Sequence, residues 1–178
     1  MNNICVIYKS KYGTTKKYAE WVAQALEVPL FEVSEIKPSQ LLNYDTIIYG
    51  GGLYASGIIG IKLVTQNPCK SLVVFTVGLS DPDTTDYSKI LSENFSQEFL
   101  QKIKVFHLRG GIDYKKIGFI DKTLMSMLIK FKVKKIPKEE RTADNELMIE
   151  TYGAKIDFTD KSTIKPLVDY VCTLYGKP

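Results

Sequence analysis

Four short runs of apolar residues, rich in β-branched side chains, constrain the fold of this 178-residue chain more than any other feature. The runs do not alternate apolar with polar residues, which is typical of strands buried on both faces, as in a parallel sheet. Helix-like stretches separate them, and strand–helix alternation with parallel strands predicts a doubly wound α/β sheet. The four runs are residues 4–8, 46–49, 72–76 and 105–108.

A weaker run at residues 30–33 predicts an edge strand, which brings the expected sheet to five strands. The last helix is expected to be capped by Ser162, with Pro166 in its first turn and Gly176 at its end. The length suits one domain covering residues 1–178. Further helices are predicted at residues 14–27, 58–66 and about 84–95.

Residues from about 110 to 160 interrupt the alternation, because connections in α/β units usually take about 2–6 residues. We therefore expect an insertion before the last helix, with a polar loop at residues 137–146. The segment from Lys115 to Lys138 holds eight lysines and one acid, Asp121, a net charge of +7 in a chain whose total is +4.

The concentration of charge in one apolar-rich segment limits the partners that we expect. A nucleic-acid binder more often spreads its basic residues over a face, so no nucleic-acid partner is predicted. Three interpretations stay open for the segment Lys115–Lys138. It contacts an anionic membrane peripherally, it receives a carboxylate-bearing substrate, or its lysines are simply hydrated.

Three cysteines without a CxxC motif and a single histidine, His107, limit the chemistry further. The odd cysteine count indicates a reducing compartment, so we expect a cytoplasmic protein, either free or peripheral to the inner face of the membrane. One histidine excludes His-rich metal sites, and no metal is predicted. Because His107 lies in an apolar run, it is interpreted as a partly buried strand residue, and no catalytic acid or base is assigned.

The turn after the first predicted strand is rich in hydroxyl groups and leads directly into a helix. Its glycine can take a tight turn, and hydroxyls with free backbone N–H groups at a helix start can surround a phosphate, which the helix dipole favours. The loop matches neither the Walker A nor the GxGxxG pattern. A capped helix start is the simpler alternative. The candidate residues are Ser10, Lys11, Tyr12, Gly13, Thr14 and Thr15.

Glycine-containing loops also follow the runs at residues 46–49 and 72–76. Because open α/β sheets bind ligands at the carboxyl ends of their strands, we expect all three loops to form one site. The run Gly50-Gly51-Gly52 predicts close approach of the backbone to a flat ligand, on which Tyr54 can stack. The candidate residues are Gly51, Gly52, Leu53, Tyr54, Thr76, Val77, Gly78, Leu79 and Ser80.

These loops resemble those of the flavodoxin-like FMN-binding family. The first loop is similar to that family's phosphate loop, written Thr/Ser-x-Thr-Gly-x-Thr: Ser10, Gly13 and Thr15 match, and Tyr12 stands where a threonine is common. The resemblance implies an α/β flavodoxin-like fold with strand order 2-1-3-4-5 and FMN as cofactor. It also implies that residues 51–54 and 76–80 flank the isoalloxazine ring.

A narrower resemblance involves the insertion. Several motifs occur in the same order as in the flavodoxin-type, menaquinone-dependent protoporphyrinogen oxidase group, which the chain resembles here. They are Arg109-Gly110-Gly111, then Tyr114, Phe119, Asp121 and Leu124-Met125, a basic run, and finally Asp157-Phe158-Thr159-Asp160. This implies an FMN-dependent oxidoreductase that acts on a porphyrinogen or a quinone. Two alternatives remain: an electron carrier that serves a redox partner, and a flavin-free interaction module, which Tyr12 and Leu79 permit.

Overall fold

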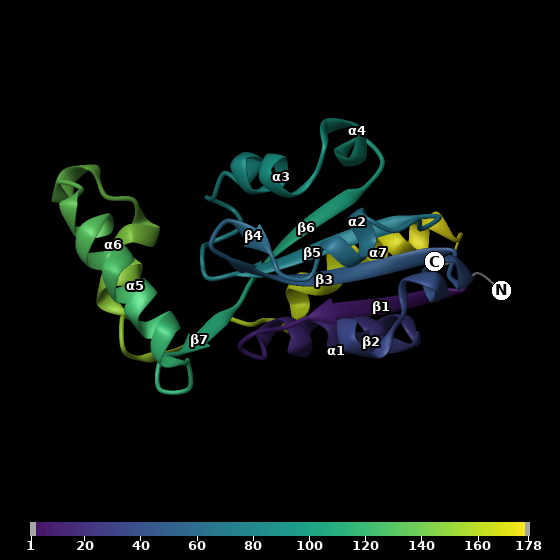
Figure 1. Cartoon of the computed structure of the whole chain (residues 1–178), viewed down its shortest axis with the longest axis horizontal. Coiled ribbons are helices and arrows are strands. Elements are labelled where there is room, and N and C mark those ends of the chain that lie inside the picture. The colour runs from purple at the N-terminus through teal and green to yellow at the C-terminus, as the bar shows by residue number, and fades with distance from the viewer. Residues whose placement is uncertain (1–2, 177–178) are drawn as a thin grey trace.

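A parallel sheet with the strand order β2-β1-β3-β5-β6 forms the centre of the computed structural model, which describes residues 3–176 (Figure 1). Counted along the chain, the parallel strands follow the order 2-1-3-4-5, as predicted. A short strand, β4 (Gly57–Ile58), adds an antiparallel pair to β3. The parallel strands are β1 (Ile4–Lys9), β2 (Leu30–Glu32), β3 (Thr46–Tyr54), β5 (Leu72–Gly78) and β6 (Lys104–Arg109).

Helices cover both faces of the sheet, which confirms the doubly wound α/β fold. One face packs on α1 (Thr14–Leu26) and α7 (Lys165–Leu174). The other packs on α2 (Lys62–Thr65), α3 (Ser88–Asn94) and α4 (Gln97–Leu100). Short 3₁₀ turns complete the connections, at Val33–Glu35, Pro38–Asn43, Val133–Lys135, Lys138–Glu140 and Lys161–Ile164.

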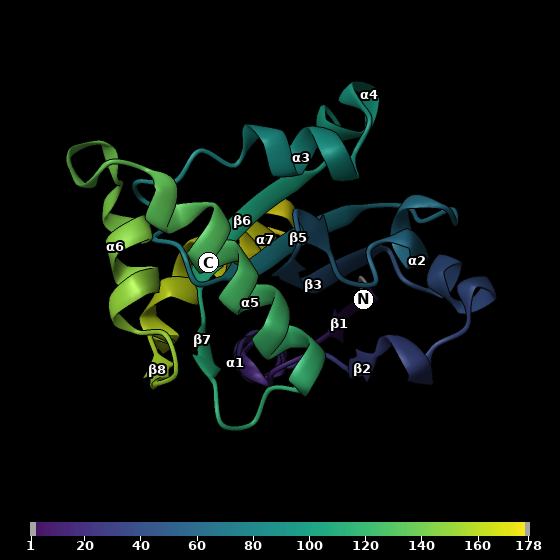
Figure 2. The same cartoon turned by 60° about the vertical axis from the view of Figure 1, so that its left-hand side comes forward.

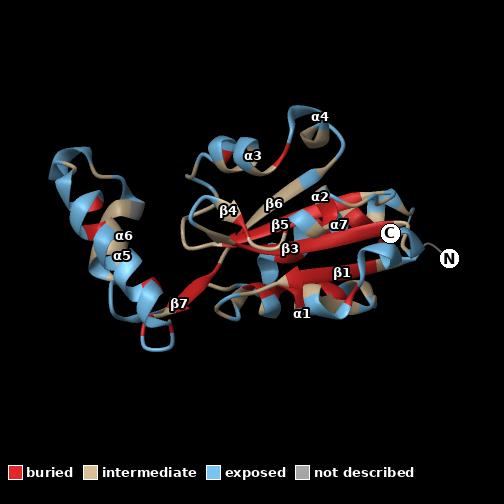
Figure 3. Ribbon diagram, viewed as in Figure 1, coloured by how far each residue is buried: buried red, intermediate tan, exposed pale blue. Residues whose placement is uncertain are grey.

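Strand β1 shows why its sequence lacks alternation. Val6 and Tyr8 belong to the apolar cluster under α1 and α7, whereas Cys5 and Ile7 belong to the cluster on the opposite face. All four residues are buried, and β1 is coloured mainly as buried in Figure 3. Side chains alternate between the faces of a strand, so a strand covered on both faces needs apolar residues at every position.

The insertion forms an arm beyond the carboxyl ends of the strands (Figures 1 and 2). The arm leaves the sheet through β7 (Gly111–Asp113) and returns through β8 (Lys155–Asp157), and these two strands pair in antiparallel fashion. Between them lie α5 (Phe119–Phe131) and α6 (Ala143–Glu150). Much of the arm is exposed, in contrast to the buried central strands (Figure 3).

Three local predictions are wrong. Helix α6 begins inside the predicted loop at residues 137–146, because the Thr142 side chain caps it by accepting a hydrogen bond from the Asn145 backbone N–H. Ser162 does not cap the last helix: a 3₁₀ turn precedes α7, the Asp160 carboxylate caps that turn by accepting a hydrogen bond from the Ser162 N–H, and α7 itself has no side-chain cap. The helix predicted at 58–66 is reduced to α2, since Gly60 has a φ of +75°.

Candidate functional site

A cavity of about 750 Å³ lies between the carboxyl edge of the sheet and helix α5. The three loops that were predicted to meet at this edge do meet there. Ser10, Gly13, Gly51 and Thr76 do not line the cavity. The predicted residues that line it are Lys11, Tyr12, Thr14, Thr15, Gly52, Leu53, Tyr54, Val77, Gly78, Leu79 and Ser80.

The loop after β1 explains why Ser10 and Gly13 stand apart. Gly13 precedes α1 with a φ of +93°, a left-handed conformation that glycine adopts without strain. The Ser10 hydroxyl accepts a hydrogen bond of 3.0 Å from the Gly13 N–H and so closes the turn. These two residues shape the loop, while Thr14 and Thr15 present the start of α1 to the cavity. The first turn of α1 has no side-chain cap and no acid, so its N–H groups and dipole favour an anion.

The triglycine run lies inside β3 instead of following it. Gly50 pairs with Phe75 and Gly51 pairs with Thr76 of β5. Because β5 extends far enough to pair with these glycines, β3 continues through them. A Cβ atom on Gly50 would lie 2.2 Å from the Phe75 ring, and one on Gly51 would lie 2.3 Å from Ile58. Packing therefore accounts for the first two glycines. Only Gly52 of the three faces the cavity.

The connection after β5 adds one aromatic side chain, Tyr87, that had no signal in the sequence. Thr76 is fully buried and lies 2.6 Å from Nδ1 of His107. The His107 ring stacks on Tyr87 at 3.6 Å, and Tyr87 in turn lines the cavity. Burial lowers the pKa of His107 to about 4, so the ring is neutral near pH 7. The prediction that His107 is a partly buried strand residue is confirmed.

The insertion contributes one carboxylate to the cavity. Asp121, on α5, is buried and lies 2.7 Å from Nζ of Lys11. The same carboxylate oxygen accepts a 2.7 Å hydrogen bond from the Tyr54 hydroxyl. The ammonium group of Lys11 also lies 3.6 Å from the centre of the Tyr54 ring. Asp121, Lys11 and Tyr54 thus form one hydrogen-bonded cluster that ties α5 to the loops after β1 and β3.

Charge and burial oppose each other in this cluster. Burial acts to lower the pKa of Lys11, but the hydrogen bonds to Asp121 and Tyr54 outweigh it, and the pKa is raised. The hydrogen bonds from Lys11 and then Tyr54 lower the pKa of Asp121 below its ordinary value. Burial raises the pKa of Tyr12, the neighbour of Lys11, to about 12. The pair of Lys11 and Asp121 is therefore fully ionised near pH 7.

The cavity also has a largely apolar outer wall built by the arm. In the sequence, Asp121 stands out as the single acid among eight lysines, and Lys132 is one of those lysines. The arm residues that line the cavity are Gly111 and Ile112 of β7, Asp121, Leu124, Met125, Leu128 and Lys132 of the α5 region, and Met148 of α6.

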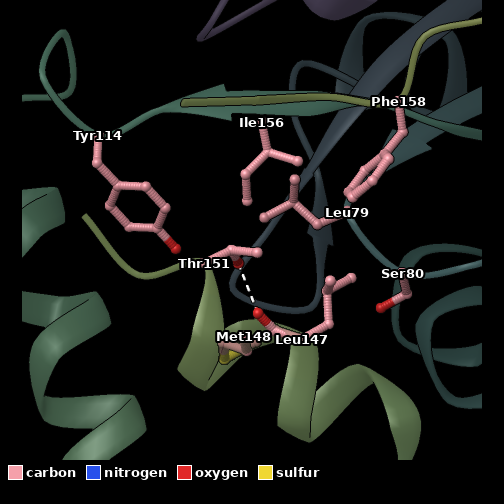
Figure 4. Close-up of a pocket in the computed structure, with 8 residues that line it drawn as sticks. All are labelled: Leu79, Ser80, Tyr114, Leu147, Met148, Thr151, Ile156 and Phe158. Atoms are coloured by element: carbon pink, nitrogen blue, oxygen red, sulfur yellow. Dashed lines mark hydrogen bonds between the residues drawn. The ribbon is translucent and has the colours of Figure 1, made fainter. Parts of the chain in front are cut away.

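A second, much smaller pocket of about 30 Å³ lies behind this wall, between the β5 loop, the β7–β8 ribbon and α6 (Figure 4). It is lined mainly by apolar side chains such as Leu79, Ile156 and Phe158. In the same region the Thr151 hydroxyl donates to the Leu147 carbonyl and holds the end of α6. Room for about one water molecule makes this a packing defect under the arm, not a ligand site.

Comparison with known proteins assigns the family. A model of the flavodoxin domain matches residues 5–139, which is most of the chain. The chain therefore belongs to the flavodoxin domain family, in agreement with its α/β fold and strand order. A search of curated proteins found no match to the chain.

Solved structures to which the chain is similar include flavodoxins and other flavoproteins. A flavodoxin from the domain Archaea is 18% identical, with a TM-score of 0.45 over 60% of this chain and 82% of that one. Flavodoxin 2 from Bacillus cereus is 18% identical, with a TM-score of 0.43 over 60% and 84%. A flavoprotein from Lactobacillus acidophilus, solved in complex with FMN, is 15% identical, with a TM-score of 0.40 over 61% and 93%.

Proposed function

We propose that this chain is an FMN-dependent oxidoreductase. The observation that supports this most directly is the cavity of about 750 Å³ at the carboxyl edge of the sheet, where the loops after β1, β3 and β5 meet. Open α/β sheets bind their ligands at this edge, next to the point where the strand order reverses. Here that point lies beside β1, whose neighbours are β2 and β3.

The donors at the start of α1 fit the phosphate of FMN. Thr14 and Thr15 line the cavity, and the uncapped first turn of α1 offers backbone N–H groups. Lys11 is already neutralised by Asp121, so the donor set for the phosphate is uncharged. A side chain at position 110 would crowd the part of the cavity next to Thr14. A Cβ atom on Gly110 would lie 3.1 Å from the Thr14 hydroxyl and 2.7 Å from Val77.

The remaining walls fit a flat ring. Tyr54 and Tyr87 contribute aromatic surfaces, and Leu53 and Leu79 contribute apolar ones. A Cβ atom on Gly52 would lie 3.1 Å from the Thr15 hydroxyl, so the glycine lets the backbone come close to a ligand. FMN, when bound, supplies the transfer of one or two electrons. The protein's part is to bind and orient the ring and to keep water from its apolar faces.

We further propose that the substrate is a porphyrinogen or a quinone. Support comes from the arm, which adds an apolar wall of Leu124, Met125 and Leu128 with Lys132 beside it. A wall of this composition suits a large apolar molecule that carries a carboxylate or a polar edge. An electron carrier needs only an exposed flavin edge, so a built wall favours an enzyme with its own substrate.

The absorption spectrum of the purified protein tests the cofactor. We expect two bands, in the blue and the near ultraviolet, that are released by acid treatment. A preparation that stays colourless when titrated with riboflavin monophosphate would overturn the proposal. Incubation with protoporphyrinogen and a quinone analogue then tests the enzyme: turnover supports it, whereas flavin reduction without substrate oxidation supports an electron carrier.

A further inference from the structure

Helix α5 presents an unpartnered apolar face to the outside of the molecule. Ile120, Leu124, Met127 and Phe131 follow each other at spacings of four, three and four residues and therefore lie on one face of the helix. Each is exposed, from 51% for Leu124 and Met127 to 74% for Ile120. Most of the large apolar side chains that are exposed among residues 3–176 lie on this helix. This set of four is called the α5 stripe below.

Positive charge surrounds the α5 stripe. Nζ of Lys130 lies 5.6 Å and Nζ of Lys135 lies 6.0 Å from the centre of the Phe131 ring, so two ammonium groups flank the end of the stripe. The segment Lys115–Lys138 contains one acid, Asp121. The carboxylate of Asp121 lines the cavity, where Lys11 neutralises it. The outer surface of this segment is therefore cationic, and no acidic side chain of the segment offsets its lysines there. Its exposed lysines are Lys115, Lys116, Lys122, Lys130, Lys132, Lys134, Lys135 and Lys138.

We infer that the α5 stripe docks on the surface of an anionic lipid bilayer. An apolar face flanked by lysines fits the boundary between headgroups and acyl chains, where the side chains enter the lipid and the lysines meet anionic headgroups. A second copy of the chain is a poor occupant, because it would bring two segments of net charge +7 face to face. None of the helices within residues 3–176 is long and apolar enough to cross a membrane, and docking of this kind needs none.

The α5 stripe lies next to the cavity. Leu124 belongs to the stripe and also lines the cavity, next to Leu128 on the inward side of the same helix. A bilayer against the stripe would therefore lie beside the apolar wall of the cavity. This inference concerns lipid binding and does not depend on the proposed cofactor.

Vesicle cosedimentation of the full chain tests the inference, with phosphatidylcholine vesicles and with vesicles that also contain phosphatidylglycerol. We expect binding at least about tenfold stronger to the anionic vesicles, and weaker binding at higher salt. The double variant Ile120→Ser/Phe131→Ser should lose most of this binding. Both residues are exposed and neither lines the cavity, so folding and cofactor binding are expected to stay unchanged.

Leu42→Ser/Leu174→Ser is the matched control, since these leucines are 47% and 46% exposed and lie far from α5 in the sequence. It should bind vesicles as the unaltered protein does. A Phe131→Trp variant reports insertion directly, because the emission of the introduced indole should shift to the blue on anionic vesicles. Equal binding to both vesicle types, full binding by the double serine variant, or an unshifted emission from the Phe131→Trp variant would each overturn the inference.

Discussion

Asp121 and Lys11 are 110 positions apart in the sequence, yet the carboxylate of one lies 2.7 Å from the ammonium group of the other at the wall of the cavity. The Tyr54 hydroxyl adds a second hydrogen bond to the same carboxylate. This cluster joins the arm to two of the three loops that form the site, so it controls how firmly α5 covers the cavity.

Asp121→Asn should loosen α5 from the sheet. The substitution removes the charge that partners Lys11 and weakens the hydrogen bond from Tyr54, so we expect a loss of about 1–2 kcal/mol in the free energy of unfolding. Amide hydrogen exchange should also become faster in residues 119–131. Asp169→Asn is the control, because it breaks an exposed ion pair with Lys165 and should cost less than about 0.5 kcal/mol. Equal effects of the two variants would contradict the proposed role of the cluster.

Gly13→Asp and Gly13→Asn separate charge from backbone strain at the loop after β1, which we propose binds the phosphate. A Cβ atom at Gly13 meets nothing within 4 Å, but the φ of +93° strains any side chain, and asparagine and aspartate tolerate such values best. We expect Gly13→Asn to keep FMN affinity within about threefold, and Gly13→Asp to lose at least about tenfold by repelling the phosphate. Fluorescence titration with FMN measures both. The same affinity in the two variants would contradict the assignment of the loop.

Gly50→Ala should destabilise the fold whether or not a ligand is bound. The added methyl group would lie 2.2 Å from the fully buried Phe75 ring, and overpacking of this kind costs about 1–3 kcal/mol. Gly57→Ala is the control, because its nearest neighbour, the Tyr54 carbonyl oxygen, lies at an ordinary 3.4 Å. Urea unfolding compares the two. If Gly50→Ala is as stable as Gly57→Ala, the packing explanation of the triglycine run fails.

His107 should make the fold sensitive to mild acid. Burial lowers its pKa from 6.5 to about 4, so as the pH falls through this window the unfolded state takes up the proton first. The stabilisation is complete above about pH 6.5 and is lost as the pH falls toward 4, by about 1–2 kcal/mol once solvent screening of this partly exposed ring is allowed for. His107→Asn, which keeps a polar atom near Thr76, should flatten the change in unfolding free energy over this range. Parallel pH profiles for the two proteins would show that another group is responsible.

The sheet can be predicted from the sequence because strands covered on both faces need apolar residues at every position. Strand β1 illustrates this, since Cys5 and Val6 enter different apolar clusters. The antiparallel pair of β7 and β8 cannot be predicted in this way. Each strand has three residues, and Lys155 and Asp157 are exposed, so the pairing depends on a tertiary contact that has no local pattern.

The position of the cavity was also predictable, because loops after parallel strands meet at one edge. The roles of individual residues were harder to predict. Gly50 and Gly51 resemble a ligand loop in the sequence, yet Phe75 and Ile58 explain them by packing. Tyr87 has no pattern of its own in the sequence, yet it lines the cavity and stacks on His107.

The β7–β8 ribbon brings the two ends of the arm together. Asp113 pairs with Lys155, so residues 114–154 leave and re-enter the fold at neighbouring positions. A short hairpin turn between Asp113 and Lys155 would close the same ribbon and leave the five parallel strands as they are. Both ends of the arm thus meet at one place on the fold, so the length and sequence of the arm can differ without a change in the strand order of the sheet.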